Sequence, residues 1–247
     1  MLRNYLPQTL RFDYKLGLTL ILLFGLIRFL VVLNATITSD YSKVSLIFVA
    51  MVLLPFLLLN RNGRREIGIC KPASYKWLGI SFLLGAGACF LVYWIGMLLF
   101  QKTGSNWFYA IGNTYPVNPA SLQEGDKLIY FIIYAIIGMT FSPIGEELFY
   151  RGMVHESLRS KFGEVKASVI DSAAFGITHL AHFGLIYSLG QWSLLPLPAV
   201  LWIILMFASG LTFGYCKRKT GSIWGAVISH AGFNLAMTYF IFYELMS

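Results

Sequence analysis

Five polar residues stand out in this chain because they lie inside long apolar segments: Glu146, Glu147, His179, His230 and Asn234. Ionisable side chains are costly in a hydrocarbon environment and are candidates for a functional role by default. Two adjacent carboxyl groups in a low dielectric do not both ionise easily, which suits one of them to act as a general base or acid near neutral pH. These residue types therefore predict acid–base chemistry in a buried site.

The segment around the two glutamates has an informative spacing. Glu147 and Arg151 are four residues apart, so on a helix they share a face and we expect them to form an ion pair. Pro143 removes one helical hydrogen bond and Ser142 can cap a new helix, so we expect the helix to kink or restart there. Taken alone, the segment fits a salt-bridged helix end at the membrane surface equally well.

His230 and Asn234 are also four residues apart and share a helix face. The Asn234 amide can donate two hydrogen bonds, so it could stabilise an oxyanion. The competing interpretation is a polar contact between helices, which is common where helices pack in lipid. His179, taken alone, is more typical of a packing residue than of a catalyst.

Three further polar residues in apolar segments are ranked lower. His182 is one turn beyond His179 and nearer the end of its segment, and Asp171 is two turns before His179 and is expected to support a partner at most. Arg28 is central in the first apolar segment. It could meet a carboxylate, extend to the membrane surface or bind a lipid headgroup, and the sequence leaves these alternatives open.

The composition indicates which elements must position these residues. Of the 247 residues, 57% are hydrophobic and 12% are charged, against about a quarter charged in a typical soluble domain. The apolar residues fall in runs long enough to cross a bilayer, and the first run is too long for a cleavable signal peptide. The three cysteines have no metal-site or redox spacing. We expect an all-α, polytopic transmembrane helical bundle with about seven spans, at 14–34, 43–60, 76–100, 127–150, 166–185, 195–216 and 221–243.

The distribution of charge orients this bundle. With the N-terminus in the cytoplasm, fourteen basic residues lie in the inner segments: Arg3, Arg11, Lys15, Arg61, Arg64, Arg65, Lys71, Lys76, Arg159, Lys161, Lys166, Lys217, Arg218 and Lys219. The outer segments hold only Lys43, Lys102 and Lys127. Because cytoplasmic loops carry an excess of Lys and Arg, we predict an N-in, C-out, multi-pass protein of the cell membrane. The basic residues behind the net charge of +8 are explained by their role in fixing the orientation of the protein in the membrane. We therefore expect no nucleic-acid partner.

Depth in the membrane connects the polar segments. Glu147, His179 and His230 each lie 11 to 13 residues from a basic residue of an inner segment. At 1.5 Å per helical residue, all three lie roughly 16–20 Å from the same membrane boundary. Because three separate helices place them at one level, a shared site is favoured over unrelated polar contacts. We expect this site to be reached from the cytoplasmic side.

At these residues the sequence resembles the CPBP intramembrane proteases, also called CAAX-processing and bacteriocin-processing proteins or the Abi family. The family motif E-E-x-x-x-R matches residues 146–151, F-x-x-x-H matches Phe175 to His179, and H-x-x-x-N matches His230 to Asn234. Each motif is weak alone, but three in this order on three spans are specific. The resemblance covers about residues 140–236. We accordingly divide the chain into N-terminal transmembrane helices with an outer loop, 1–126, and a catalytic core, 127–247.

The resemblance implies an intramembrane endopeptidase with a glutamate-dependent mechanism. One glutamate of the pair would activate water, assisted by His179. His230 and Asn234 would stabilise the tetrahedral oxyanion. Arg151 would orient the glutamate pair, and Phe175 is a supporting residue of the second motif.

Family members are also described as metalloenzymes, because one glutamate and two histidines can bind zinc. The chain has no H-E-x-x-H sequence, so we predict a metal-free mechanism without a cofactor, with zinc as the alternative.

The expected partners are a substrate and membrane lipid. The family includes type II CAAX prenyl endopeptidases and bacterial members linked to peptide processing or bacteriocin self-immunity. No span follows the His-x-x-x-Asn segment, which favours a hydrophobic peptide or a membrane protein as substrate over a farnesylated CAAX protein. The alternative function is bacteriocin self-immunity by binding, with or without proteolysis. A transporter is disfavoured because no internal repeat is apparent.

Overall fold

The computed structural model describes residues 1–246. The α-helices are α1 (Tyr14–Thr38), α2 (Ser42–Leu58), α3 (Arg61–Glu66), α4 (Lys76–Phe100), α5 (Trp107–Gly112), α6 (Glu124–Glu147), α7 (His155–Thr178), α8 (Pro196–Thr220) and α9 (Ile223–Tyr239). π-Helices follow α6 at Leu148–Val154 and α9 at Phe240–Leu245, and short 3₁₀ turns lie at Pro119–Ser121 and His179–Ala181. The strands in this part of the chain, β1 (Leu185–Ser188) and β2 (Gln191–Leu194), form one antiparallel hairpin.

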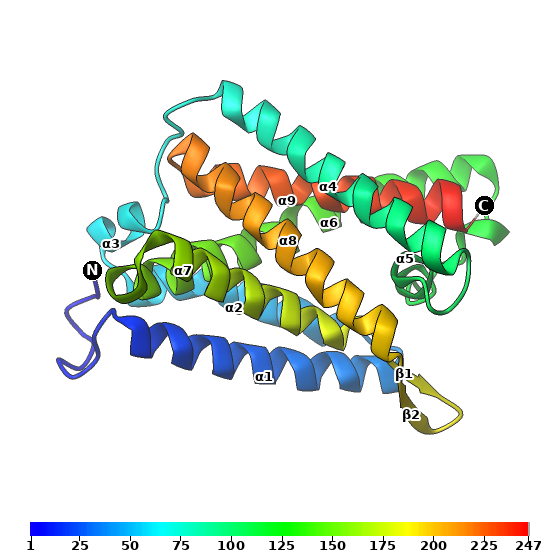
Figure 1. The fold of residues 1–247 in the computed structure, drawn as a ribbon, viewed down its shortest axis with the longest axis horizontal. Coiled ribbons are helices and arrows are strands. Elements are labelled where there is room, and N and C mark those ends of the chain that lie inside the picture. Colours follow the sequence, from blue (N-terminus) through cyan, green and yellow to red (C-terminus); the bar gives the residue numbers. More distant parts are fainter. Residues whose placement is uncertain (247) are drawn as a thin grey trace.

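The long helices lie along one direction and pack side by side as a bundle (Figure 1). The N-terminus and α3 lie at one end, and the C-terminal end of the described chain lies at the other, together with α5 and the hairpin. The predicted all-α helical bundle is confirmed.

Five stretches of the described chain are long and apolar enough to cross a membrane: Tyr14–Thr38, Lys76–Phe100, Glu124–Ala181, Pro196–Thr220 and Ile223–Leu245. The third contains both α6 and α7, and α2 is a shorter apolar helix of 17 residues. Each of the seven predicted spans therefore contains one long helix. Leucines such as Leu22, Leu83 and Leu98 are more than half exposed on the outside of the bundle, where lipid would cover them.

Two features of the site helices differ from the predictions. The helix does not restart at Pro143, because α6 continues through it to Glu147, and the kink expected there as the alternative stays a prediction. The irregularity comes later, as the π-helix at Leu148–Val154, a feature found frequently at functional sites. The predicted span 166–185 is also too long, since α7 ends at Thr178 and His179 begins a 3₁₀ turn.

The connection between α4 and α6 folds back into the bundle. Trp107 and Phe108 of α5 are fully buried, and the Trp107 ring stacks on that of Trp202 in α8 with centroids 5.9 Å apart. Asn106 caps α5 by accepting hydrogen bonds from two backbone amides. This segment is therefore a structured loop, and the rings of Trp107 and Phe108 pack in the core.

Helices α4 and α9 approach closely because glycines face the partner backbone. A Cβ atom on Gly85 would overlap the carbonyl of Ser229, and one on Gly232 would overlap the carbonyl of Phe82. Small residues allow such close approach, which is a main source of helix association in lipid. This contact fixes the position of α9, which carries His230 and Asn234.

We expect Gly85→Ala to lower stability by about 1–3 kcal/mol or more, because the new methyl group forces α4 and α9 apart. The matched control is Gly87→Ala on the exposed side of α4, where an added Cβ meets no atom within 4 Å. Thermal unfolding in detergent measures both variants. Equal unfolding midpoints for the two would contradict this account of the α4–α9 contact.

Candidate active site

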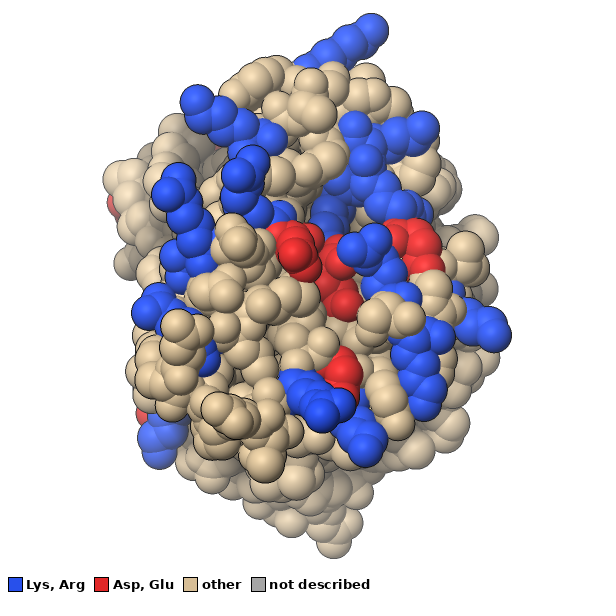
Figure 2. Space-filling view, turned by 90° about the vertical axis from the view of Figure 1, so that its left-hand side faces the viewer, with Lys and Arg blue, Asp and Glu red and all other residues tan. Residues whose placement is uncertain are grey.

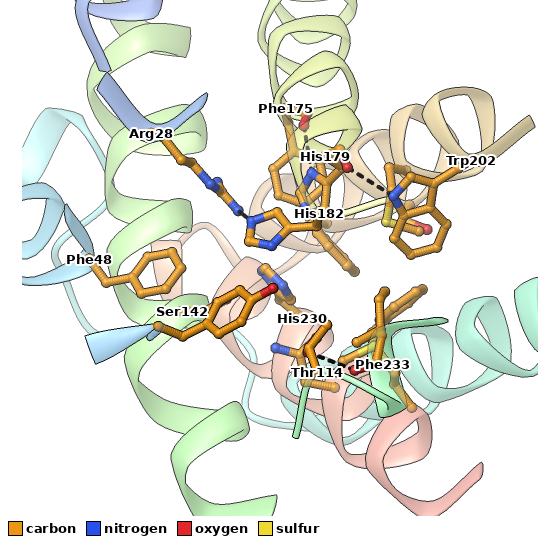
Figure 3. A pocket seen from close by; sticks show the side chains of 17 residues that line it. Arg28, Phe48, Thr114, Ser142, Phe175, His179, His182, Trp202, His230 and Phe233 are labelled. Atoms are coloured by element: carbon orange, nitrogen blue, oxygen red, sulfur yellow. Dashed lines mark hydrogen bonds between the residues drawn. The ribbon is translucent and has the colours of Figure 1, made fainter. Parts of the chain in front are cut away.

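The polar residues singled out in the sequence converge near the middle of the bundle. Glu146 and Glu147 come from the end of α6, and His230 comes from α9. His179 begins the turn after α7. Arg28 of α1, which the sequence ranked lower, joins them. Figure 3 shows Arg28, His179, His182 and His230 around one cavity.

Glu147 is the most enclosed of these residues, with no exposed side-chain surface. Its Oε1 accepts a hydrogen bond from Arg151 Nη1 at 3.1 Å and lies 2.9 Å from Nδ1 of His230. Since a carboxylate oxygen can only accept, the His230 Nδ1 carries the proton of the second bond. The ion pair predicted between Glu147 and Arg151 is present, and Glu147 also holds the His230 ring in place.

Arg151 is fixed from several sides. Its Nε lies 3.6 Å from Oδ1 of Asp171, and its guanidinium lies 4.4 Å above the ring of Phe175. Asp171 in turn pairs with His155, whose Nδ1 is 2.7 Å from Oδ2. Phe175, the first residue of the F-x-x-x-H motif, thus serves as an aromatic support for the arginine of the E-E-x-x-x-R motif.

Glu146 has a separate cationic partner. Its carboxylate forms an ion pair with Arg28, and both side chains are at least 97% buried. The Arg28 Nη2 also lies 3.1 Å from Nε2 of His182 and can donate a hydrogen bond to it. Of the alternatives left open for Arg28, the structure therefore supports contact with a carboxylate. The low ranking of Arg28 and His182 is corrected, because both belong to the site.

A cavity of about 160 Å³ adjoins these charges. Its polar lining consists of Arg28, Tyr41, Thr114, Ser142, His179, His182, Ser209, His230 and Asn234, and aromatic and aliphatic side chains complete it. The two glutamates do not line the cavity. Instead they lie directly behind lining residues, Glu146 behind Arg28 and Ser142, and Glu147 behind His230.

The histidines present defined nitrogen atoms to the cavity. His179 Nδ1 lies 2.7 Å from the carbonyl oxygen of Phe175 and must donate to it, which leaves Nε2 free for other contacts. Trp202 donates to the His179 carbonyl at 3.1 Å and holds the turn. His230 stacks on Phe213 with ring centroids 4.7 Å apart. Neither ring can therefore rotate easily.

Asn234 fits both interpretations that its position in the sequence left open. Its Nδ2 donates a hydrogen bond of 2.8 Å to the carbonyl of Gly138 in α6, so it is a contact between helices. It also lines the cavity, and an amide nitrogen has a second hydrogen to donate. One residue can thus join α6 to α9 and contact a bound molecule.

The side chains present do not fit a zinc ion. Within residues 1–246, no group of three or more His, Cys, Asp or Glu residues could hold a metal. The carboxylates of Glu146 and Glu147 are held by the guanidinium groups of Arg28 and Arg151, which place positive charge where a cation would have to bind. We therefore derive no step through zinc, and the metal-free mechanism stays a prediction.

The cavity extends toward the end of the molecule opposite the basic one. Among its lining residues are Tyr41, in the α1–α2 connection, Ile111 in α5, and Thr114, in the loop after α5. These segments lie at the end opposite the N-terminus (Figure 1). The lining therefore favours access from that end, and the predicted access from the cytoplasmic side stays a prediction. Depth along a helix does not by itself determine which end of a cavity is open.

Comparison with known proteins supports the family resemblance. Residues 128–236 match the family model described as type II CAAX prenyl endopeptidase, Rce1-like. No curated protein and no solved structure matches the chain. The match includes all three motifs and excludes Arg28. The resemblance to the CAAX-protease family is thus confirmed for this part of the chain, and at the level of the family it supports a membrane endopeptidase.

Replacing Arg28 tests the ion pair with Glu146. We expect Arg28→Met to lower the unfolding free energy by about 3–5 kcal/mol, because it leaves a buried carboxylate without a counter-charge. The double variant Arg28→Met/Glu146→Gln should recover most of this loss, since neither charge remains. Thermal unfolding in detergent measures both.

Arg159→Met provides the control. Arg159 is 52% exposed and pairs with Glu156 at the surface, so its loss should cost less than about 1 kcal/mol. Equal destabilisation of the Arg28 single and double variants would show that the loss of stability does not come from an unpaired Glu146 carboxylate.

Proposed function

We propose that this protein is an intramembrane endopeptidase of the cell membrane that cleaves a hydrophobic peptide or membrane-protein substrate with a water molecule activated by Glu146. The observation that carries the proposal is the arrangement of two carboxylates, each with its own guanidinium partner, behind a cavity lined by histidines. Hydrolysis in a bilayer requires a base held near a water-sized space, because lipid excludes bulk water.

The two glutamates differ in which residues their oxygen atoms contact. Glu147 uses one oxygen to accept from both Arg151 and His230, which suits a positioning role. The Oε2 of Glu146 lies 3.5 Å from Ser142 Oγ and 3.7 Å from His230 Nε2, and both of these residues line the cavity. The 3.7 Å between Glu146 Oε2 and His230 Nε2 is too long for a direct hydrogen bond, and we assign the reacting water to a bridging position between them. Glu146 is accordingly the proposed base.

The proposed reaction assigns one role to each motif residue. The water oxygen attacks the carbonyl carbon of the scissile peptide bond while Glu146 takes the proton, with His179 Nε2 accepting the second hydrogen bond of the water. The remaining N–H of Asn234 donates to the oxyanion, and His230, which lines the same cavity, is the second residue that stabilises it. Glu146 then gives its proton to the amide nitrogen, the C–N bond breaks, and a carboxyl group and an amine are released.

Glu146→Gln should reduce cleavage by about 10²–10⁴-fold, because an amide cannot accept the proton of the water. Membrane peptides from cells that express the wild type or the variant would be compared by mass spectrometry, and a peptide spanning the cut site would then be assayed with purified protein. Glu124→Gln, at the exposed start of α6, is the matched control and should retain full activity.

Undiminished cleavage by a folded Glu146→Gln protein would overturn the proposal. The same variant distinguishes the proposed hydrolysis from the alternative function, which is bacteriocin self-immunity by binding. If it still protects cells from a bacteriocin as well as the wild type does, protection depends on binding and not on hydrolysis.

A further inference from the structure

Basic residues gather at one end of the bundle. Figure 2 shows this end, with Lys and Arg side chains over much of its face and a small acidic group near its centre. The fourteen basic residues named above lie here, in the N-terminal segment, in and after α3, early in α7 and at the end of α8. The opposite end has Lys43, Lys102 and Lys127 among the acidic residues Asp40, Glu124, Asp126 and Glu244. Such asymmetry places the basic end in the cytoplasm.

The site cavity continues toward the other end. An apolar cavity of about 710 Å³ between α2 and α6 shares four lining residues with it: Tyr41, Phe48, Thr114 and Ser142. The wider cavity also reaches Asp40 and Pro116 in the connections at the less basic end. The two cavities therefore adjoin each other at these four residues, and together they extend from that end to His230 and Asn234.

The basic end is closed to the site. A polar cavity of about 200 Å³ enters there between residues such as Arg65 and Glu164 and extends as far as Arg151. It shares no lining residue with the site cavity among the residues described. Arg151, Glu147 and Asp171 lie between the two and are at least 98% buried. These ion-paired side chains fill the space through which a cytoplasmic substrate would have to pass.

We propose that the active site opens to the extracytoplasmic side and takes its substrate from there, as an extended hydrophobic segment of an exported or membrane-inserted peptide. The proposal rests on the proposed endopeptidase function for its substrate. The passage is lined mainly by aromatic and aliphatic side chains such as Phe48, Ile137 and Phe141, which fit apolar residues of a peptide. A peptide that enters here reaches the histidines and Asn234 before it meets the buried ion pairs.

Labelling of single cysteines tests the direction of opening. In a chain whose Cys70, Cys89 and Cys216 are replaced by serine, Thr114→Cys and Arg61→Cys would be treated with a membrane-impermeant maleimide. Both positions are exposed, one at the mouth of the passage and one in α3. We expect Thr114→Cys to be labelled in intact cells and Arg61→Cys only after the membrane is permeabilised. The reverse pattern, or equal labelling of both in intact cells, would overturn the proposal.

A second measurement tests the direction of opening in case the cysteine-free chain does not fold. An epitope inserted after Leu189 lies at the tip of the hairpin, where Leu189 is fully exposed, and the native cysteines can remain. An antibody should bind this epitope on intact cells. Binding that requires permeabilisation would contradict the outward opening. Neither readout depends on catalysis, so each stands even if no cleavage is found.

The passage itself is tested by blocking it. Modification of Thr114→Cys from outside with a bulky maleimide should reduce cleavage at least tenfold, because the adduct occupies the shared mouth of both cavities. Leu189→Cys is the matched control: it lies at the same end but does not line either cavity, and its modification should leave cleavage unchanged. Cleavage that is unaffected by complete labelling at Thr114 would show that the substrate takes another route.

Discussion

The burial of charge is the constraint on which the site depends. Glu146, Glu147, Arg28 and Arg151 are all nearly inaccessible inside a bundle whose outer surface is apolar. An unpaired charge in such surroundings costs several kcal/mol, so each carboxylate must meet a cation in good geometry. The ion pairs of Arg28 with Glu146 and Arg151 with Glu147 therefore hold α1 and the π-helix after α6 at one depth. Through Glu147, the same constraint extends to His230 on α9.

The charged cluster also makes the site rigid before any substrate binds. Arg151 lies over Phe175, and His230 stacks on Phe213, so the cationic and imidazole groups have flat aromatic supports. His179 is held by hydrogen bonds at its ring and at its carbonyl. Preorganised donors contribute more to catalysis than mobile ones, since they need not reorient as charge develops. The aromatic residues of the second motif and of α8 thus have a physical reason to be aromatic.

Local relationships in the site could be predicted from the sequence, and distant ones could not. The Glu147–Arg151 pair follows from a spacing of four residues on a helix. The partner of Arg28 does not, because Glu146 lies in another helix and no periodic pattern connects α1 with α6. A signal was nevertheless present, since an arginine at the centre of an apolar span is itself a candidate functional residue. The helix does not restart at Pro143 because α6 tolerates the missing hydrogen bond, as helices in membrane proteins often do.

Depth and access are separate properties of a buried site. Positions counted from the basic loops place the motif residues roughly 16–20 Å from one boundary, near the middle of a hydrocarbon core of about 30 Å, so depth alone does not favour access from the basic end. The direction of opening then depends on which side of the cavity the compensating ion pairs occupy. Here Arg151, Asp171 and His155 extend from Glu147 toward the basic end, so the side chains that neutralise the site also close that end. The open space is left between α2 and α6 on the other side, where apolar residues need no partners.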